Sequence, residues 1–475
     1  MIGKRSFRKP AWPEVLLLGL CAAVCSFQIL IPPYIGLASN GDFGKVFARF
    51  AMAPPDGGAR NFMYFVSDYR FDPKYLWESD VESSENVVAG IPILTAKALG
   101  ASGFNIRWLG ALHMLLFLCA YSALLLYLRR HGPVFQLAIG GLALWIFTDV
   151  AYVAYFNSFF SDTAALLGLL LMVPLALYLA AQTPPRAAVV WLFTAAALLF
   201  ITSKTQHALW GVFPAAFLFW RRRLAAPILL LAAEAYVVLS TPWTYPACPL
   251  FTAIFAKAAP NAPSPQAAVR EVGLGEAEYR FIGQQAYAPG LPTVDLDWLR
   301  YFTGRTSYGK LMRFWLRHPG EAARVMYADL KIVAPRMRQL NLANFRREDG
   351  HPPMQLTTRF ATWSRLRNKL YSGWPLFVVG WYAVVIAAAF VILMRDRPQR
   401  AKAAICLGLA IMAVLEFVFA SLTDANETDR HLLIFHTLTE MTICFAAAWA
   451  LTLAQRAGIF RRVQAPQLSE GALSR

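Results

Sequence analysis

The 475-residue sequence has little charge for its length. Asp, Glu, Lys and Arg make up 15% of it, against about 25% in an average soluble domain. Hydrophobic residues make up 57%, and many lie in apolar runs of roughly 20 residues, long enough to cross a bilayer core. This composition excludes a disordered or fibrous chain and argues against a soluble one. It predicts an all-α, polytopic membrane protein, and it makes nucleic acid an unsuitable partner despite the formal charge of +17.

The sequence also lacks the cysteine pattern of a disulfide scaffold or a zinc site. Only Cys248 falls in a segment expected to face water, and one such thiol cannot form an intrachain disulfide. No Cys and His spacing matches a zinc site. The other five cysteines lie within apolar runs: Cys21, Cys25, Cys119, Cys406 and Cys444.

Hydropathy predicts about ten transmembrane helices. The segments 187–203 and 205–220 are short and could form a hairpin that does not fully cross. The apolar stretch 86–100 contains Pro92 and Lys97 and is expected to pack at the surface. The ten predicted spans are 15–37, 108–128, 134–150, 163–181, 187–203, 205–220, 224–241, 374–394, 403–422 and 432–453.

Basic residues predict the orientation of these spans. Ten spans put both termini on one side, and the short loops of that side carry clusters such as 129–130, 221–223 and 395–402. Because Lys and Arg in short loops stay cytoplasmic, both termini are predicted to be cytoplasmic. The two long loops, 38–107 and 242–373, then face outward. A basic start followed by an apolar run also resembles a signal peptide, but the length of the run favours an anchor.

Four regions follow from this topology. We expect an N-terminal transmembrane module (1–241, including the outer loop 38–107), an extracytoplasmic loop domain (242–373), a C-terminal transmembrane module (374–454) and a cytoplasmic tail (455–475). The loop domain carries 18 Lys and Arg against nine Asp and Glu. Its basic stretch 300–347, with Phe314 and Trp315, suits either an interfacial amphipathic helix or a helix packed on its own domain.

Two acidic residues follow predicted spans on the outer side. Asp42 stands between Gly41 and Gly44, which allow a tight turn beside a carboxylate that could act as a general base. Asp162 lies in an aromatic stretch with Asn157, and an acid in such surroundings needs a compensating cation. Each Asp could instead cap a helix N-terminus.

Basic residues occur at other outer span ends. Lys204, with His207, opposes the charge bias of the outer side and suggests a phosphate ligand, although a lysine there could also snorkel to lipid headgroups. Arg430 and His431 begin the last span. Arg430 could bind a lipid phosphate bidentately or pair with its acidic neighbours Asp424, Glu427 and Asp429.

These elements together resemble the GT-C superfamily of integral-membrane glycosyltransferases. The stretches 40–44 (NGDFG), 155–162 (YFNSFFSD) and 429–432 (DRHL) are similar to those of its bacterial glycan-biosynthesis hexose transferases. The resemblance implies a polyprenyl-phosphate-linked sugar donor, a glycan or lipid acceptor, and inverting transfer on the outer face of a bacterial inner membrane. Asp42 would be the base, Asp162 would orient the acceptor or a metal, and Lys204 and Arg430 would hold the phosphate. We also expect His207, His431 and Asn157 to contact substrate.

Several points remain open in the sequence. There is no Asp-x-Asp pair, so a divalent cation is only weakly supported and no metal ligand is assigned. A transporter or flippase for lipid-linked glycans would share a basic, aromatic cavity without needing Asp42 as a base. A membrane acyltransferase would need a catalytic His, and no His lies in a recognisable setting. The sequence names neither the sugar nor the acceptor.

Overall fold

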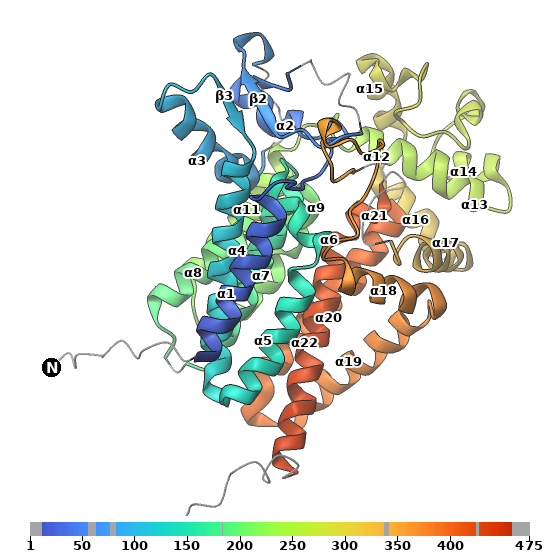
Figure 1. Ribbon diagram of the computed structural model, residues 1–475. Helices are drawn as coiled ribbons and strands as arrows, with labels where there is room; N and C mark the ends of the chain where they lie inside the picture. Colours follow the sequence, from blue (N-terminus) through green and yellow to red (C-terminus); the bar gives the residue numbers. More distant parts are fainter. Residues whose placement is uncertain are drawn as a thin grey trace, which may run out of the picture.

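The protein is a bundle of long helices with a smaller, irregular part gathered at one end (Figure 1). The computed structural model describes residues 12–55, 63–76, 82–182, 184–336, 342–423 and 427–457. The start of α1 and the end of α22 lie at the same end of the bundle, opposite the irregular part. The predicted tail from residue 458 and the basic start of the chain fall outside the described residues.

Ten predicted spans correspond to helical segments. Within the described residues, six helices are long and apolar enough to cross a membrane, and a seventh span arises if α5 and the turn after it, bent by 55°, count as one. The count of ten stays a prediction, because α8, α10 and α11 are shorter. The bundle helices are α1 (Trp12–Ile29), α4 (Arg107–Leu128), α5 (Pro133–Phe147), α7 (Ser161–Ala180), α8 (Ala187–Ile201), α10 (Val212–Trp220), α11 (Ala225–Ser240), α19 (Phe377–Arg395), α20 (Arg400–Thr423) and α22 (Leu433–Arg456).

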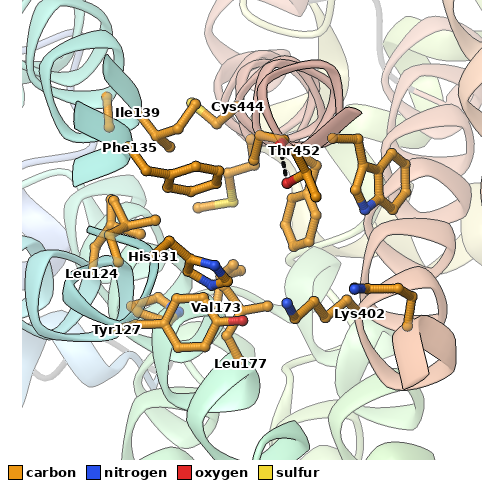
Figure 2. Close-up of a pocket in the computed structure, with 18 of the residues that line it drawn as sticks. Leu124, Tyr127, His131, Phe135, Ile139, Val173, Leu177, Lys402, Cys444 and Thr452 are labelled. Atoms are coloured by element: carbon orange, nitrogen blue, oxygen red, sulfur yellow. Dashed lines mark hydrogen bonds between the residues drawn. The ribbon is translucent and has the colours of Figure 1, made fainter. Parts of the chain in front are cut away.

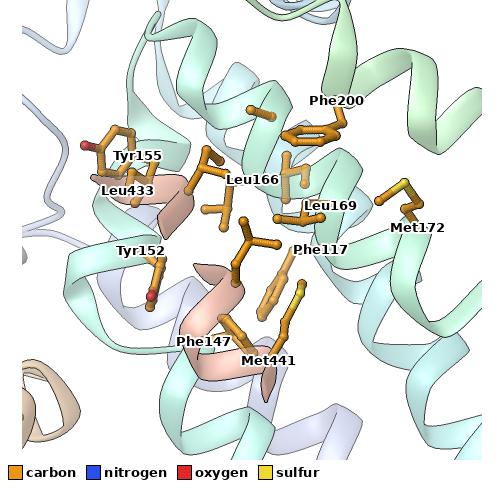
Figure 3. Close-up of a cluster of buried hydrophobic side chains, with 14 of the residues drawn as sticks. Phe117, Phe147, Tyr152, Tyr155, Leu166, Leu169, Met172, Phe200, Leu433 and Met441 are labelled. Atoms are coloured by element: carbon orange, nitrogen blue, oxygen red, sulfur yellow. The ribbon is translucent and has the colours of Figure 1, made fainter. Parts of the chain in front are cut away.

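Helix α7 forms the centre of the bundle. It is apolar around its whole circumference, as expected of a helix surrounded by others, and most of its residues are buried. Figure 3 shows Leu166 and Leu169 of α7 among aromatic side chains of α4, α5 and the turn that follows α5. The first turns of α22 join this cluster through Leu433 and Met441. The core therefore ties the N-terminal and C-terminal helices together near the irregular end.

The first long loop folds into helices and a small antiparallel sheet. The all-α prediction did not include this sheet, whose strands are only two to four residues long. Tyr69 pairs with Phe104, and both side chains are buried, so the sheet covers the bundle end with one apolar face. Its elements are α2 (Gly44–Phe47), β1 (Met52–Ala53), β2 (Asp68–Phe71), α3 (Ser84–Ala98) and β3 (Gly103–Asn105).

The second long loop forms a helical unit with its own core. In α16, Phe314 and Trp315 are buried within this unit, and Trp315 donates a hydrogen bond to the Leu422 carbonyl of α20 at 2.9 Å. The apolar face of α16 therefore packs inside the protein and is not free to enter a membrane. Its helices are α12 (Ala247–Thr252), α14 (Pro265–Glu271), α15 (Leu296–Arg305), α16 (Tyr308–Arg317), α17 (Pro319–Ile332) and α18 (Thr362–Gly373).

Candidate active site

A cavity of about 1150 Å³ lies where the two folded loops meet the end of the bundle. Its floor includes Asp42, Lys204 and Arg430, which come from three segments far apart in the sequence. The second folded loop provides much of the remaining wall, including Tyr245 and Tyr308. The cavity thus collects the charged residues that the sequence places at separate outer span ends.

Asp42 is held facing this cavity by the turn in front of α2. Gly41 has a φ of +110°, a conformation that L side chains rarely adopt, and the Asp42 amide donates to the Asn40 side chain at 3.1 Å. The residue before α2 is Phe43, and no side chain caps the helix. The helix-cap interpretation of Asp42 is therefore wrong. Its carboxylate instead contacts Lys45 at 2.6 Å and Arg430 at 2.8 Å.

Arg430 is the centre of the charged network. Its side chain is only 6% exposed, and it contacts Asp42 at 2.8 Å, Glu427 at 2.9 Å and Asp162 at 3.5 Å. The guanidinium also lies 4.9 Å from the ring centre of Phe160. The predicted pairing of Arg430 with its neighbour Glu427 is present. The guanidinium also reaches Asp42 and Asp162, and its role as a phosphate ligand stays a prediction. Asp424 lies outside the described residues.

Lys204 and Asp162 form a buried pair below the cavity floor. Lys204 Nζ lies 2.7 Å from each Asp162 carboxylate oxygen, and both side chains are largely buried. Lys204 therefore points into the protein and does not snorkel toward headgroups. No side-chain hydrogen bond caps α7, so Asp162 acts as an ion-pair partner and not as a helix cap. Lys204 lines the cavity, whereas Asp162 supports it from behind.

Burial and neighbouring charges shift the pKa values of Asp42 and Lys204, which lie outside the spans, in opposite directions. Burial would raise the pKa of Asp42, but the nearby Arg430 and Lys45 outweigh it and lower that pKa well below its usual range. Burial lowers the pKa of Lys204, an effect that Asp162 partly opposes. Asp42 is consequently ionised at neutral pH and, while it holds both cations, is a weak base.

Aromatic and amide groups surround the charged floor. Lys45 lies 5.2 Å from the ring centre of Tyr245. Gln206 and Trp210 both donate hydrogen bonds to Glu416, at 2.6 and 2.7 Å, which fixes the corner that carries Lys204. Aromatic residues on the lining are Phe159, Trp243, Tyr245, Tyr287, Tyr308 and Phe419.

Three further predicted site residues have different positions. His431 lines the cavity, whereas His207 is buried beneath it, with Nδ1 2.8 Å from the Ser203 hydroxyl. Asn157 lies away from the lining and donates to the carbonyls of Ile29 and Ile35 at 2.9 and 2.7 Å. The prediction that His207 and Asn157 contact substrate is not supported by these positions. Asn157 instead holds the segment that leads from α1 to Asp42.

Glycine makes the position of Asn157 possible. A Cβ at Gly110 would stand 2.0 Å from the Asn157 side-chain oxygen, and one at Gly36 would stand 2.6 Å from its carbonyl oxygen. Real Cβ atoms do not approach so closely, so only glycine fits at either place.

The sequence did not predict Lys45 and Tyr245 as parts of the site, and it predicted Glu427 only as a possible partner of Arg430. Lys45 follows Asp42 by three residues, and Glu427 precedes Arg430 by three, spacings that bring side chains together on a helical turn. This signal was available in the sequence. Tyr245 had none, because only the folding of the second loop over the bundle brings it to Lys45.

The residues present do not fit a divalent cation. In the described part of the chain, no group of three or more His, Cys, Asp and Glu side chains is arranged to hold a metal ion. The charge between Asp42 and Asp162 is already neutralised by Arg430, which contacts both. A metal ion there would be repelled by a guanidinium that cannot lose its proton.

Comparisons with known proteins give one family match and two similar solved structures. A family model described as the YfdI N-terminal transmembrane domain matches residues 3–464. No curated protein matches in sequence. Two solved structures of an oligosaccharyltransferase from Archaeoglobus fulgidus are similar over 96% and 95% of this chain, each with 11% identity and a TM-score of 0.41. One is AglB in complex with an inhibitory peptide and a dolichol-phosphate, and the other carries a tethered acceptor peptide. The chain covers 52% and 51% of their lengths, about half.

Proposed function

The chain belongs to the YfdI N-terminal transmembrane domain family, a GT-C-like family, and from this membership we propose that it is a membrane hexosyltransferase. It transfers a sugar from a polyprenyl-phosphate-linked donor to a cell-envelope glycan or lipid acceptor. One observation carries the proposal: Asp42, at the cavity floor, is held by Arg430 and Lys45 in the same ion network. A base and cations for a leaving phosphate are the two groups that this reaction needs.

The donor phosphate binds where the carboxylates now hold the cations. Its oxygens compete with Asp42 for Arg430 and Lys45, because phosphate and carboxylate accept the same charge-assisted hydrogen bonds. Arg430 Nη2 now contacts both Asp42 and Glu427, so a phosphate oxygen that replaces Asp42 at this donor leaves Glu427 in place. Lys204 adds a third cation at the same floor.

Release of the cations turns Asp42 into a better base. With Arg430 and Lys45 engaged by phosphate, the pKa of Asp42 rises from its depressed position toward its ordinary value. The carboxylate then takes the proton of the acceptor hydroxyl, and the hydroxyl oxygen attacks the anomeric carbon from the side opposite the phosphate. The bond between that carbon and the phosphate oxygen breaks with inversion, and polyprenyl phosphate leaves with the bonding electron pair.

The charge of the leaving phosphate accounts for the three cations at the cavity floor. A phosphodiester carries one negative charge, and the phosphate monoester that leaves carries about −1.5 to −2 at pH 7. Negative charge therefore increases as the bond breaks, beside Arg430, Lys204 and Lys45. Preorganised cations at such a position lower the barrier, because they are aimed at charge that develops in the transition state.

The upper wall suits a sugar acceptor. Tyrosine and tryptophan offer an apolar ring together with a polar tip, which matches a sugar ring with its hydroxyl edge. Trp243, Tyr287 and Tyr308 line the cavity above the charged floor. The acceptor hydroxyl thus reaches Asp42 from the side of the second folded loop, while the lipid of the donor stays on the bundle side.

The proposed orientation places this cavity on the extracytoplasmic face of a bacterial inner membrane. Both termini are then cytoplasmic, and the loops 38–107 and 242–373 form the outer part. Polyprenyl-linked sugars are membrane-bound, so a cavity at the bundle end and beside the bilayer is where such a donor can present its phosphate.

Deletion of the gene followed by mass analysis of surface glycans tests the function. The expected result is a glycan or lipid that lacks one hexose, restored by the wild-type gene and not by the Asp42→Asn variant. In proteoliposomes, wild-type protein should release polyprenyl phosphate from a labelled polyprenyl-phosphate hexose when extracts of the deletion strain supply the acceptor. Movement of the labelled donor between leaflets without any release of polyprenyl phosphate would overturn the proposal in favour of a transporter.

A further inference from the structure

A second, smaller cavity lies at the end of the bundle opposite the candidate active site. It has a volume of about 250 Å³ and is a crevice between α4, α5 and α7 on one side and α20 and α22 on the other. Figure 2 shows Tyr127 and His131 facing Lys402 and Thr452 across it. Its walls are almost entirely apolar, and polar groups occur at one end only. None of these residues takes part in the proposed transfer reaction.

Helix α22 is less buried along the part that lines this crevice. From Leu433 to Thr442 every residue of the helix is buried, as described for the core above. From residue 443 onward none is fully buried, although the sequence stays apolar through Trp449. These residues still pack partly against the core. An apolar helix that protein covers only in part needs another apolar partner on its open side, and within a membrane that partner is lipid.

The crevice has the length of one membrane leaflet. Its lining on α22 runs from Met441 to Arg456, and 15 residues of helix span about 22 Å. Half of a hydrocarbon core is about 15 Å thick. The apolar wall is thus long enough for one extended acyl chain, with the remaining length at the level of the headgroups.

Positively charged residues lie at the end of the crevice farthest from the candidate active site. Lys402 and Arg456 line it, and Arg130 lies next to it, 5.4 Å from the ring centre of Tyr127. Lys402 lies 5.9 Å from the same ring. Arg130 and Lys402 therefore share a single aromatic ring, and Arg456 adds a third cation to the same end of the crevice.

Among the described residues that line the crevice, one carboxylate faces these cations, and it is already engaged. Asp396 lines the crevice and accepts a hydrogen bond from the Gln399 amide at 3.2 Å, capping the turn before α20. Three cations against one acid leave a net positive rim. Basic pockets between transmembrane helices are a common way to hold anionic headgroups.

We propose that this crevice binds an anionic phospholipid from the leaflet at that end of the bundle. One acyl chain lies between α5 and α22, and the headgroup phosphate contacts Lys402 and Arg456. The lipid would join the helices on either side of the crevice along the part of α22 that protein covers only in part. In the predicted orientation this is the cytoplasmic leaflet, and the site is separate from the donor cavity.

Lipid-dependent thermal stability of the purified, delipidated full-length protein tests the proposal. Phosphatidylglycerol in detergent micelles should raise the melting temperature at lower concentration than phosphatidylcholine, and inorganic phosphate should not reproduce the effect. Lys402→Gln combined with Arg456→Gln should weaken phosphatidylglycerol binding by roughly 25-fold, because each basic residue near an anionic lipid contributes about five-fold. Binding of phosphatidylcholine should change little.

Two further variants separate the headgroup from the chain. Ala448→Phe fills the crevice, since Ala448 lines it, and should reduce stabilisation by both lipids. Ala446→Phe, on the same helix but outside the lining, and Arg395→Gln, an exposed cation near the same end, should behave as wild type.

Three results would overturn the proposal. Equal stabilisation by both lipids would show that the headgroup charge is not recognised, and stabilisation by inorganic phosphate would show that no lipid is needed. Equal losses of lipid stabilisation in Ala446→Phe and Ala448→Phe would show that the lipid does not bind in the crevice. Stabilisation by polyprenyl phosphate but not by phosphatidylglycerol would assign the crevice to a different lipid.

Discussion

Replacing Asp42 with Asn separates chemistry from structure at the candidate active site. The side chain keeps its size and one oxygen that can accept from Lys45, which lies 2.6 Å away. It loses the charge that faces Arg430 at 2.8 Å and can no longer take a proton from a hydroxyl. The substitution therefore removes the proposed base while leaving most of the local packing.

The structural and catalytic costs differ in size. The Asp42 side chain is 28% exposed, so loss of its ion pairs should lower the free energy of unfolding by about 1 kcal/mol. Arg430 remains paired with Glu427 and Asp162, which limits the damage. Loss of a general base costs roughly 100-fold to 10,000-fold in rate, and 100-fold corresponds to about 2.7 kcal/mol of activation free energy.

Release of polyprenyl phosphate from a labelled donor in proteoliposomes measures this loss. Glu427→Gln is the matched control, because it also removes a carboxylate from Arg430 at 2.9 Å but removes no base. We expect Asp42→Asn to reach the membrane, melt within a few degrees of wild type and lose at least 100-fold in rate. Glu427→Gln should lose less than tenfold. Wild-type turnover by the Asn variant, or equal losses in both variants, would refute Asp42 as the base.

Three other predictions follow from the same network and from the topology. Arg430→Met should reduce kcat more than it raises KM for the donor, measured by polyprenyl phosphate release, because the guanidinium faces charge that grows during transfer. Lys45→Met should move the acidic limb of the kcat/KM profile to higher pH: removal of a cation raises the pKa of Asp42, and the base loses activity as pH falls through that pKa. With Cys248 replaced by Ser in both variants, a membrane-impermeant thiol reagent should label intact cells carrying Pro263→Cys and not those carrying Arg397→Cys, and the reverse pattern would invert the topology.

Much of the bundle could be predicted because membrane spans depend on local composition. Runs such as 163–181 and 374–394 differ from α7 and α19 by only a few residues at either end. The short helices α8, α10 and α11 show the limit of this approach. Hydropathy identifies an apolar helix, but whether it crosses depends on its tilt and its neighbours.

The folded loops were less predictable because their structure depends on distant contacts. The strands β1 to β3 have two to four residues each, too few to produce an alternating pattern. The burial of Phe314 and Trp315 in α16 was equally invisible in the sequence, since an amphipathic helix looks the same whether it faces lipid or protein. Only the neighbouring residues of the second loop and Leu422 of α20 decide it.

In the candidate site, some residues could be predicted from the sequence and others could not. Asp42, Lys204 and Arg430 could be predicted because charge at the outer end of a span is costly and therefore noticeable. Asn157 was also noticeable for its polarity, but its amide satisfies two backbone carbonyls. A buried asparagine that bonds to the backbone and one that binds substrate look the same in the sequence. Only the contacts in the structure distinguish the two roles.

In the proposed reaction, the balance of charge in the network would favour the transition state over the bound donor. Three carboxylates, Asp42, Asp162 and Glu427, face three cations, and an unpaired buried cation would be costly. The carboxylates thus keep Arg430 and its neighbours in place before the donor arrives. If the proposed donor binds here, its one negative charge can replace one carboxylate, and a leaving phosphate with nearly two charges can replace a second. The cations would then bind the departing phosphate more strongly than the intact donor, which is the condition for raising kcat and not only affinity.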